Sequence, residues 1–214
     1  MAIFEVIYIS NSSAMIQEIS GSRAAGLARM AYYYFDFRDD KKQDSYGLLS
    51  SLLSQLSARS DVCYEILSRL YSKTASGTEK PDNSALTECI KEMLCLPEQC
   101  PIYIIVDALD ECPDSPGMPS AREEVLQLVE ELVTNRQKHP NLRLCVASRP
   151  EIEIRKVLGP LKPLEISLHD EDGHNMDIFK FIESVVYSDR KMQSWREDDK
   201  RLVIDTLSEK AGGM

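Results

Sequence analysis

Hydrophobic and polar residues alternate along the chain in patterns that predict strands and helices in turn. Residues 3–9 alternate as a strand does, and residues 10–13 supply turn and N-cap chemistry for a helix that starts near Ala14. The aromatic-rich residues 30–37 predict a second strand. Residues 102–106 are apolar without a break, which is typical of a strand buried on both faces of a parallel sheet.

The rest of the chain adds helices at regular intervals. Between residues 45 and 71, leucine and isoleucine recur at helical spacing, which predicts two amphipathic helices or one helix broken near Ser60. Polar loops are expected over residues 72–83 and 113–119. The remaining predicted elements are a helix at 84–96, a helix at 121–138 capped by Ser120, strands at 142–147 and 163–168, and helices at 176–187 and 197–210. Strands and helices that alternate over such long crossovers predict a three-layer α/β sheet, mainly parallel.

Composition excludes some classes of function. Asp and Glu number 35 against 25 Lys and Arg, and the formal net charge of −10 gives no general attraction to nucleic acid or to an anionic membrane. The first ten residues lack the basic region of an export signal, and no apolar run approaches the roughly 18 residues of a membrane span. The six cysteines form no C-x-x-C pair, which predicts reduced, mostly buried thiols in a cytoplasmic protein.

An acidic run, Asp107-Ala-Leu-Asp110-Glu111, closes the apolar strand at residues 102–106. A carboxylate in this position lies at the carboxyl edge of the sheet, where doubly wound folds bind ligands. Asp107 is therefore a candidate to hold Mg²⁺ beside nucleotide phosphates, and Asp110 or Glu111 to orient or deprotonate an attacking water. The alternative is that the run only ends a strand and starts a turn.

A second candidate group follows the strand at residues 142–147. Ser148 and Arg149 would face the same crevice, because one crossover through the helix at 121–138 makes the two strands neighbours. Arg149 would contact a terminal phosphate bidentately and report its presence. A surface salt bridge is the alternative for Arg149.

Together these segments carry a family resemblance. IIVDALDE at residues 104–111, followed by LCVASRP at 144–150, resembles the Walker B and sensor-1 motifs of NACHT ATPases, which belong to the signal-transduction ATPases with numerous domains (STAND). YFDFRD at residues 34–39 and LLSSLLSQL at 48–56 resemble fungal NACHT proteins with a nephrocystin-like N-terminal module. Segments near 177–182 and 210–214 do so as well, and the resemblance covers about residues 12–214.

The resemblance implies a P-loop NTPase-type sheet, incomplete at both ends, with a nucleotide-binding core at residues 1–170 and the start of a helical segment at 171–214. It also implies ATP and Mg²⁺ as cofactors, with Asp107 as the metal ligand and Asp107, Ser148 and Arg149 around the nucleotide. Asp110, Glu111 and Arg149 would act in hydrolysis. Self-association or partner proteins, engaged through flanking ankyrin or WD repeats, would complete a signalling switch without nucleic acid or membrane.

One departure from the family pattern limits this expectation. The phosphate-binding motif G-x-x-x-x-G-K-[ST] occurs nowhere in the chain, and residues 12–19 resemble the helix that follows that loop. We therefore expect weak or absent ATP binding and hydrolysis. Two alternatives remain open, a non-catalytic NACHT-like scaffold and a fragment of a larger protein.

Overall fold

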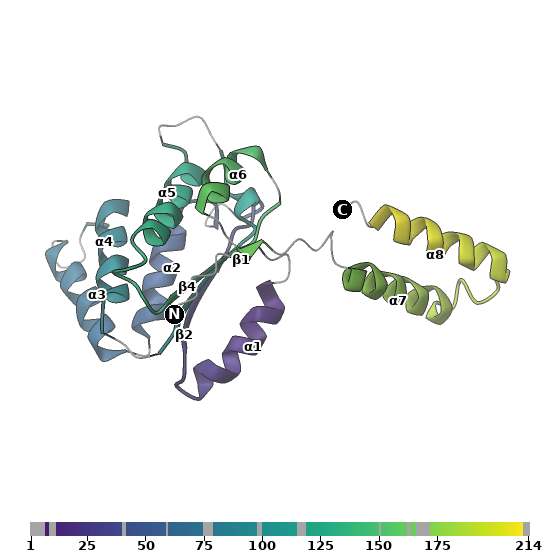
Figure 1. The fold of residues 1–214 in the computed structure, drawn as a ribbon, viewed down its shortest axis with the longest axis horizontal. Helices are drawn as coiled ribbons and strands as arrows, with labels where there is room; N and C mark the ends of the chain where they lie inside the picture. Colours follow the sequence, from purple (N-terminus) through teal and green to yellow (C-terminus); the bar gives the residue numbers. More distant parts are fainter. Residues whose placement is uncertain are drawn as a thin grey trace. The chain divides into compact units, whose positions relative to one another are not determined.

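The computed structural model describes residues 7–8, 12–39, 42–58, 60–74, 79–97, 100–114, 119–149, 151–161, 164–165 and 172–211. The chain divides into two compact units, Met1–Ile166 and Ser167–Met214 (Figure 1). We call them unit 1 and unit 2. The identity of these units as a nucleotide-binding core and a following helical segment stays a prediction.

Unit 1 contains one sheet with the strand order β2-β3-β4-β1-β5. All of its described pairings are parallel. The strands are β1 (Ile7–Tyr8), β2 (Arg29–Tyr34), β3 (Ile102–Asp107), β4 (Leu142–Val146) and β5 (Leu164–Glu165). The predicted α/β fold with a mainly parallel sheet is confirmed.

The strand order determines where the helices lie. From β1 the chain crosses β4 and β3 to reach β2, and it then returns through β3 and β4 and passes β1 to β5. Right-handed crossovers place helices on opposite faces when the direction of travel reverses. The helix α1 (Ser12–Ala24) accordingly covers one face and contacts β2 and β3. The opposite face carries α2 (Ser45–Ser57), α3 (Asp61–Lys73), α4 (Asn83–Leu94), α5 (Ala121–Thr134) and α6 (Ile152–Leu158) (Figure 1).

Two hydrophobic clusters, one on each face, hold these three layers together. Ile104 and Val106 of β3 belong to the larger cluster with the helices α2 to α6. Ile105 belongs to the smaller cluster on the α1 face. Because consecutive strand residues point to opposite faces, the unbroken apolar run of β3 is required by burial on both sides.

Several predicted boundaries shift, each for a local reason. The helical stretch between residues 45 and 71 is two helices, because the Ser60 hydroxyl accepts a hydrogen bond from Cys63 N and starts α3. Ser120 caps α5 in a capping box with Glu123, as expected. The helix ends at Thr134 rather than residue 138, because Asn135 leaves the helical conformation with a ψ of 23° and its side-chain amide binds the Glu131 carbonyl.

Two further differences concern elements rather than boundaries. Strand β2 ends at Tyr34 rather than residue 37, since the amide of Asp39 donates to the carbonyl of Asp36 and closes a turn there. The seven-residue helix α6 was not predicted at all. Expected strand residues 3–6, 9, 163 and 166–168 lie outside the described residues.

The outer edge of β2 is closed by a side chain instead of a strand. The amide of Tyr32 donates to Gln55 Oε1 at 3.1 Å, and Gln55 Nε2 donates to the Tyr32 carbonyl at 2.7 Å. Gln55 thus makes both hydrogen bonds that a neighbouring strand would make at this residue. Unpaired edge groups are templates for association between chains, and this contact removes one such pair.

Replacing Gln55 with leucine should lower the free energy of unfolding by about 1–2 kcal/mol, because Tyr32 loses both partners. It should also increase light scattering at high protein concentration, since the edge becomes available. Urea denaturation and static light scattering test this, with Ser54→Ala at an exposed position of the same helix as the control. Equal behaviour of the two variants would refute a role for Gln55 at the edge.

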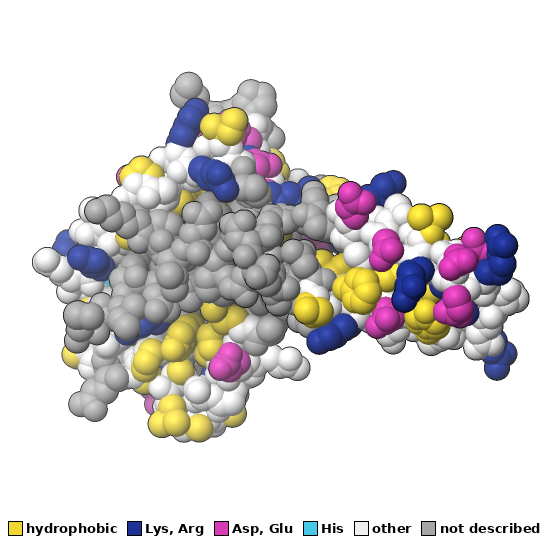
Figure 2. Space-filling model, turned by 45° about the vertical axis from the view of Figure 1, so that its right-hand side comes forward, with side chains coloured by type: hydrophobic (Ala, Val, Ile, Leu, Met, Phe, Trp, Pro, Cys, Tyr) yellow, Lys and Arg dark blue, Asp and Glu magenta, His cyan; other side chains and the backbone are white. Residues whose placement is uncertain are grey.

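Unit 2 consists of α7 (Asp172–Ser188) and α8 (Glu197–Ala211), which pack against each other. Tyr187 Oη donates to Glu197 Oε2 at 2.9 Å, and Lys200 Nζ lies 5.3 Å from the centre of the Tyr187 ring. Figure 2 shows hydrophobic side chains exposed among the charged ones on this unit. Within the described part of the chain, no helix combines the length and the apolar character needed to cross a membrane.

Candidate functional site

The site is built at the carboxyl edge of β3. Asp107 is the last residue of that strand, and its Oδ2 accepts a hydrogen bond of 2.5 Å from the hydroxyl of Ser12. Ser12 is the first residue of α1 and only 2% exposed. Residues 95 positions apart in the sequence therefore meet where the first helix leaves the sheet. Open parallel sheets bind ligands at this carboxyl edge of the strands.

A strained turn carries the chain from Asp107 to the next acidic residues. Ala108 has a φ of 53°, a left-handed conformation that is uncommon for residues other than glycine. Its amide donates to Asp107 Oδ1 at 2.9 Å. The amide of Leu109 then donates to the Ala147 carbonyl at 3.0 Å, which ties the turn to the end of β4. The turn is thus fixed from both strands, as strained backbone near functional sites requires.

Asp110 and Arg149 are brought together, as the strand pairing predicts. The amide of Arg149 donates to Asp110 Oδ1 at 3.0 Å, and the guanidinium Nε lies 3.5 Å from Oδ2. The Asp110 side chain is 11% exposed, whereas that of Arg149 is 84% exposed. Asp110 therefore fixes the base of Arg149 while most of the guanidinium faces solvent. The hydroxyl of Ser148 donates to the Arg149 carbonyl at 2.8 Å, so this serine supports the loop.

Glu111 is turned toward the segment after β2. Its Oε2 accepts a hydrogen bond of 3.2 Å from the amide of Phe37. Nearby, hydrogen bonds from Arg38 lower the pKa of Asp36, and the same contact raises the pKa of Arg38, with a smaller contribution from Glu111. Glu111 thus lies in a surface network of charges beside the candidate site.

Two residues that carry the site geometry were not predicted from the sequence. Ser12 is one, because its contact with Asp107 follows from the sheet order. Arg122 of α5 is the other: its Nε donates to the Cys112 carbonyl at 2.9 Å and its Nη2 to the Asp110 carbonyl at 2.7 Å. Nη1 donates to Glu151 at 2.5 Å. Arg122 thereby joins the turn after β3 to the residue that precedes α6.

The buried thiols near the site are not suited to nucleophilic chemistry. Burial, and then the charge of Asp107, raise the pKa of Cys145 to about 12. Burial likewise raises the pKa of Cys112 to about 12. Because the thiolate is the nucleophilic form, both cysteines stay inert at neutral pH.

The oxygen atoms of Ser12 and Asp107 suit a hard divalent cation such as Mg²⁺ better than a softer transition metal. A hydroxyl and a carboxylate are hard donors, and Mg²⁺ usually keeps several waters beside one or two protein ligands. Among the described residues, no group of three or more His, Cys, Asp and Glu side chains forms a metal cage. A site of this kind needs no such cage.

The residues present do not fit a phosphate cradle. If Ser12 takes the last position of G-x-x-x-x-G-K-[ST], then Glu5, Ser10 and Asn11 occupy the positions of the two glycines and the lysine. Strand β1 at Ile7–Tyr8 also lies within the span that the loop would need. The lysine charge and the glycine conformations are both missing. The site therefore has residues that suit a metal ion, Ser12 and Asp107, but lacks the loop that binds phosphate.

Comparison with known proteins finds a matching family model and a solved structure with a similar chain. The model of the family described as nephrocystin 3, N-terminal, matches residues 11–149, a span that contains Ser12, Asp107, Asp110 and Arg149. A solved structure of Drosophila ORC bound to AT-rich DNA and Cdc6 includes a similar chain at 12% sequence identity, with a TM-score of 0.42. That match covers 98% of this chain and 73% of the other. No curated protein matches the chain.

Proposed function

The chain belongs to the nephrocystin 3 N-terminal family, and on that premise we propose that unit 1 is an NTPase-type signalling module that keeps the metal-binding residues and lacks the phosphate-binding loop. The finer identity that we propose is a fungal NACHT domain of the STAND group, acting in the cytoplasm. The motifs at residues 104–111 and 144–150 support it.

The hydrogen bond between Ser12 and Asp107 is the observation that carries this proposal. It pairs the hydroxyl at the start of the first helix with the carboxylate at the end of β3, the two protein groups that hold Mg²⁺ in P-loop NTPases. A bound cation would neutralise phosphate charge at this edge. Asp110 would hold Arg149 in place to meet a terminal phosphate.

The absence of the phosphate-binding loop limits the affinity of the chain for a nucleotide. A single charge-assisted hydrogen bond to a phosphate contributes about 1.5–3 kcal/mol, which corresponds to a factor of roughly 10 to 150 in affinity. The amide cradle of the glycine-rich loop is lost in addition. We therefore assign no hydrolytic step to this chain and expect ATP binding to be weak or absent.

Restoring the glycines and the lysine of the phosphate-binding loop should restore nucleotide binding. We expect no saturable binding of Mg-ATP to the natural chain at millimolar concentration, and at least tenfold tighter binding to the variant Glu5→Gly/Ser10→Gly/Asn11→Lys. Isothermal titration calorimetry measures both. Adding Asp107→Asn to the variant should reduce the restored affinity when Mg²⁺ is present and should have little effect in EDTA, because the carboxylate acts through the metal.

Two outcomes would contradict the proposal. Micromolar binding of ATP to the natural chain, with hydrolysis lost on Glu111→Gln, would show that the chain binds nucleotide phosphates without the missing loop. A restored variant that binds ATP equally well with and without Asp107→Asn in the presence of Mg²⁺ would show that the Asp107 carboxylate does not act through a metal. Circular dichroism of the variant establishes that it is folded.

A non-catalytic scaffold is the second candidate function. Phe181, Leu202 and Trp195 of unit 2 are 69%, 66% and 43% exposed, and exposed apolar side chains favour contact with another protein surface when they are contiguous. Such a surface suits self-association or a partner protein. Multi-angle light scattering of the chain and of Phe181→Ser tests this, and a monomer at all concentrations would exclude self-association as the role of this surface.

A further inference from the structure

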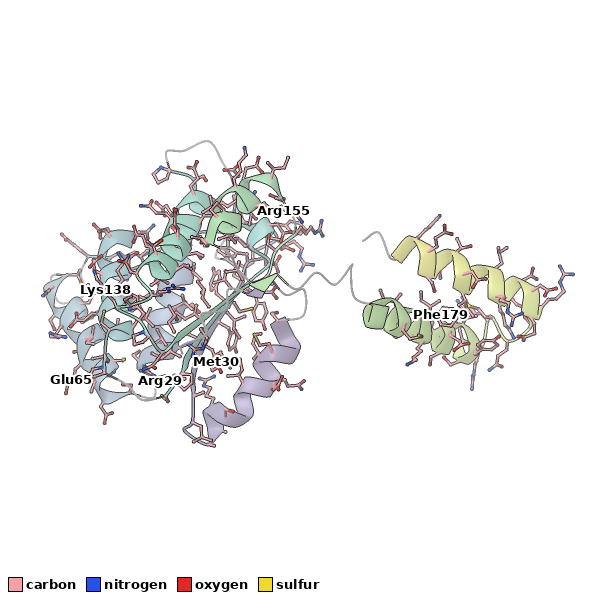
Figure 3. All side chains as sticks on the ribbon, viewed as in Figure 1. Arg29, Met30, Glu65, Lys138, Arg155 and Phe179 are labelled. Atoms are coloured by element: carbon pink, nitrogen blue, oxygen red, sulfur yellow. The ribbon has the colours of Figure 1, made fainter. Side chains whose placement is uncertain are left out.

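A groove between α3, α4 and α5 lies away from the candidate nucleotide edge. It has a volume of about 770 Å³, and its lining includes Lys73 of α3 and Lys138, which Figure 3 labels. His139 lines the same groove and precedes β4, so the groove lies near the amino ends of the strands. Asp107 lies at the carboxyl end of β3. A ligand in this groove would therefore leave the nucleotide edge free.

Ion pairs join α4 to both of its neighbours along the groove. Arg69 of α3 pairs with Glu92 of α4. Lys91 of α4 pairs with Glu131 of α5 at 2.8 Å and with Glu88 at 2.9 Å. Hydrogen bonds to Glu131 and Glu88 raise the pKa of Lys91, and the hydrogen bond from Lys91 lowers the pKa of Glu131. Each glutamate among the described lining residues thus has a cation of the groove as its partner.

Two other cations of the groove have no such partner. No described carboxylate forms an ion pair with Lys73 or Lys138, and both side chains are exposed. They lie on different walls, since Lys73 ends α3 and Lys138 follows α5. The chain as a whole has a formal net charge of −10, so two unpaired lysines at one groove are a local exception. Charge complementarity at this groove favours an acidic ligand.

A smaller hollow that adjoins the groove at Lys91 and Glu131 lacks this feature. It has a volume of about 360 Å³ and is lined by residues of α2, α4 and α5. Lys91 is the only cation among its described lining residues, and it is already paired, while Glu124 adds a further carboxylate. The preference for an acidic ligand is thus confined to the larger groove.

The walls of the groove favour a helical ligand over an extended one. Within a helix the backbone groups bond to one another, so these walls offer no row of free amides and carbonyls to an added strand. A helical ligand satisfies its own backbone and needs only side-chain contacts. Leu70 and Ala85 are partly exposed in the groove and can contact its apolar face. The 12 residues of α4 extend over about 18 Å, which is enough for about three turns of a second helix.

We propose that this groove docks a short acidic amphipathic helix of a partner protein. Its carboxylates would meet Lys73 and Lys138, and its apolar side chains would pack on Leu70 and Ala85. The inference does not depend on nucleotide binding. Because the unpaired lysines are exposed, the interaction is sensitive to salt.

Fluorescence anisotropy with two labelled peptides tests the groove on the intact chain. The probe is a synthetic helix of about 14 residues with leucine on one face and glutamate on the other, and the control carries glutamine in place of each glutamate. We expect the acidic peptide to bind below about 1 mM and at least threefold more tightly than the control. Raising NaCl from about 50 to about 500 mM should remove this preference.

The net charge of the chain makes this comparison stringent. A chain with a net charge of −10 repels an acidic peptide in general, so a preference for glutamate over glutamine requires a local basic site. Equal or weaker binding of the acidic peptide, or no saturable binding of it, would overturn the proposal.

Variants locate the binding. Lys73→Gln/Lys138→Gln should weaken the acidic peptide at least threefold and leave the glutamine peptide unchanged. Lys156→Gln/Lys191→Gln removes the same charge at exposed positions outside the groove and should have no effect. An equal effect of the two double variants would mean that the peptide responds to net charge, and it would overturn the assignment to this groove. All four lysines are exposed, so folding should be unaffected, and circular dichroism checks this.

A second copy of the chain is the competing occupant of the groove. Sedimentation velocity over a range of protein concentrations decides between the two. We expect Lys73→Gln/Lys138→Gln to sediment as the natural chain does at every concentration. Association of the natural chain that this variant abolishes would assign the groove to a second copy and overturn the proposal of a separate partner.

Discussion

Replacing Arg122 with methionine should lower the free energy of unfolding of unit 1 by about 3 kcal/mol. The guanidinium makes hydrogen bonds with the carbonyls of Cys112 and Asp110 and an ion pair with Glu151. Methionine keeps much of the apolar packing but leaves two carbonyls and one carboxylate without their donor. Glu151 is partly exposed and can be solvated, which holds the expected loss at the lower end for a buried pair.

Urea denaturation followed by circular dichroism measures this change. The matched control is Arg136→Met, the same substitution at an exposed position just beyond α5, which should cost less than about 0.5 kcal/mol. Arg122→Lys should be intermediate, because an ammonium keeps the charge but cannot reach three acceptors as the planar fork does. A loss no larger than that of Arg136→Met would show that the clamp contributes little.

The same variant connects stability with the site. Arg122 binds the carbonyl of Asp110, and the Asp110 carboxylate holds the amide and guanidinium of Arg149. Hydrogen exchange at the amide of Arg149 should therefore accelerate in Arg122→Met beyond the change expected from global stability. Arg122 acts through other residues and is a positioning residue in this sense.

The sequence could predict the edge at which these residues meet, because parallel strands share their carboxyl ends. Asp107, Asp110 and Arg149 follow two apolar runs that one helix connects, and adjacency of β3 and β4 follows from that single crossover. Ser12 could not be placed in the same way. Ser12 begins the helix that follows β1, and β1 lies beyond β4 in the sheet. No local pattern of the sequence determines that strand order.

Arg122 illustrates a second limit. It lies in the first turn of α5, where the helix dipole disfavours a cation and where Glu123 and Glu124 follow the expected pattern. The unfavourable placement is the signal that could have identified it as a residue with tertiary partners. Short elements escaped for another reason, since the seven residues of α6 span too few turns for a periodic pattern.

Truncation of two consecutive residues of β3 should reveal how differently the two faces of the sheet are packed. Ile104 and Ile105 are 1% and 0% exposed, and they lie in the larger and the smaller hydrophobic cluster respectively. We expect Ile104→Ala to cost about 4 kcal/mol, near the upper end for such changes, and Ile105→Ala about 2–3 kcal/mol. The difference arises because the cost of a cavity depends on how far its walls can collapse.

The walls of the two cavities differ in the side chains that line them. Around Ile105 lie Met30 and, from α1, Met15 and Ile16, with Met30 on the α1 side of β2 (Figure 3). Methionine has three rotatable bonds and fills irregular gaps. Only α1 among the described helices covers this face, so we expect it to move inward when a cavity forms, whereas Ile104 is enclosed by helices that are themselves packed against one another.

Urea denaturation of the two alanine variants tests this expectation, with Ile104→Val and Ile105→Val as controls that remove a single carbon. Each control should cost about 1 kcal/mol, so that a difference between the faces appears only when the cavity is large. An equal or greater loss for Ile105→Ala would mean that α1 is held as rigidly as the helices opposite. In that case Ser12 at the start of α1 would also be fixed against Asp107 by packing, and in Asp107→Asn the Ser12 hydroxyl would still contact the side chain at position 107, now by donating to its amide oxygen.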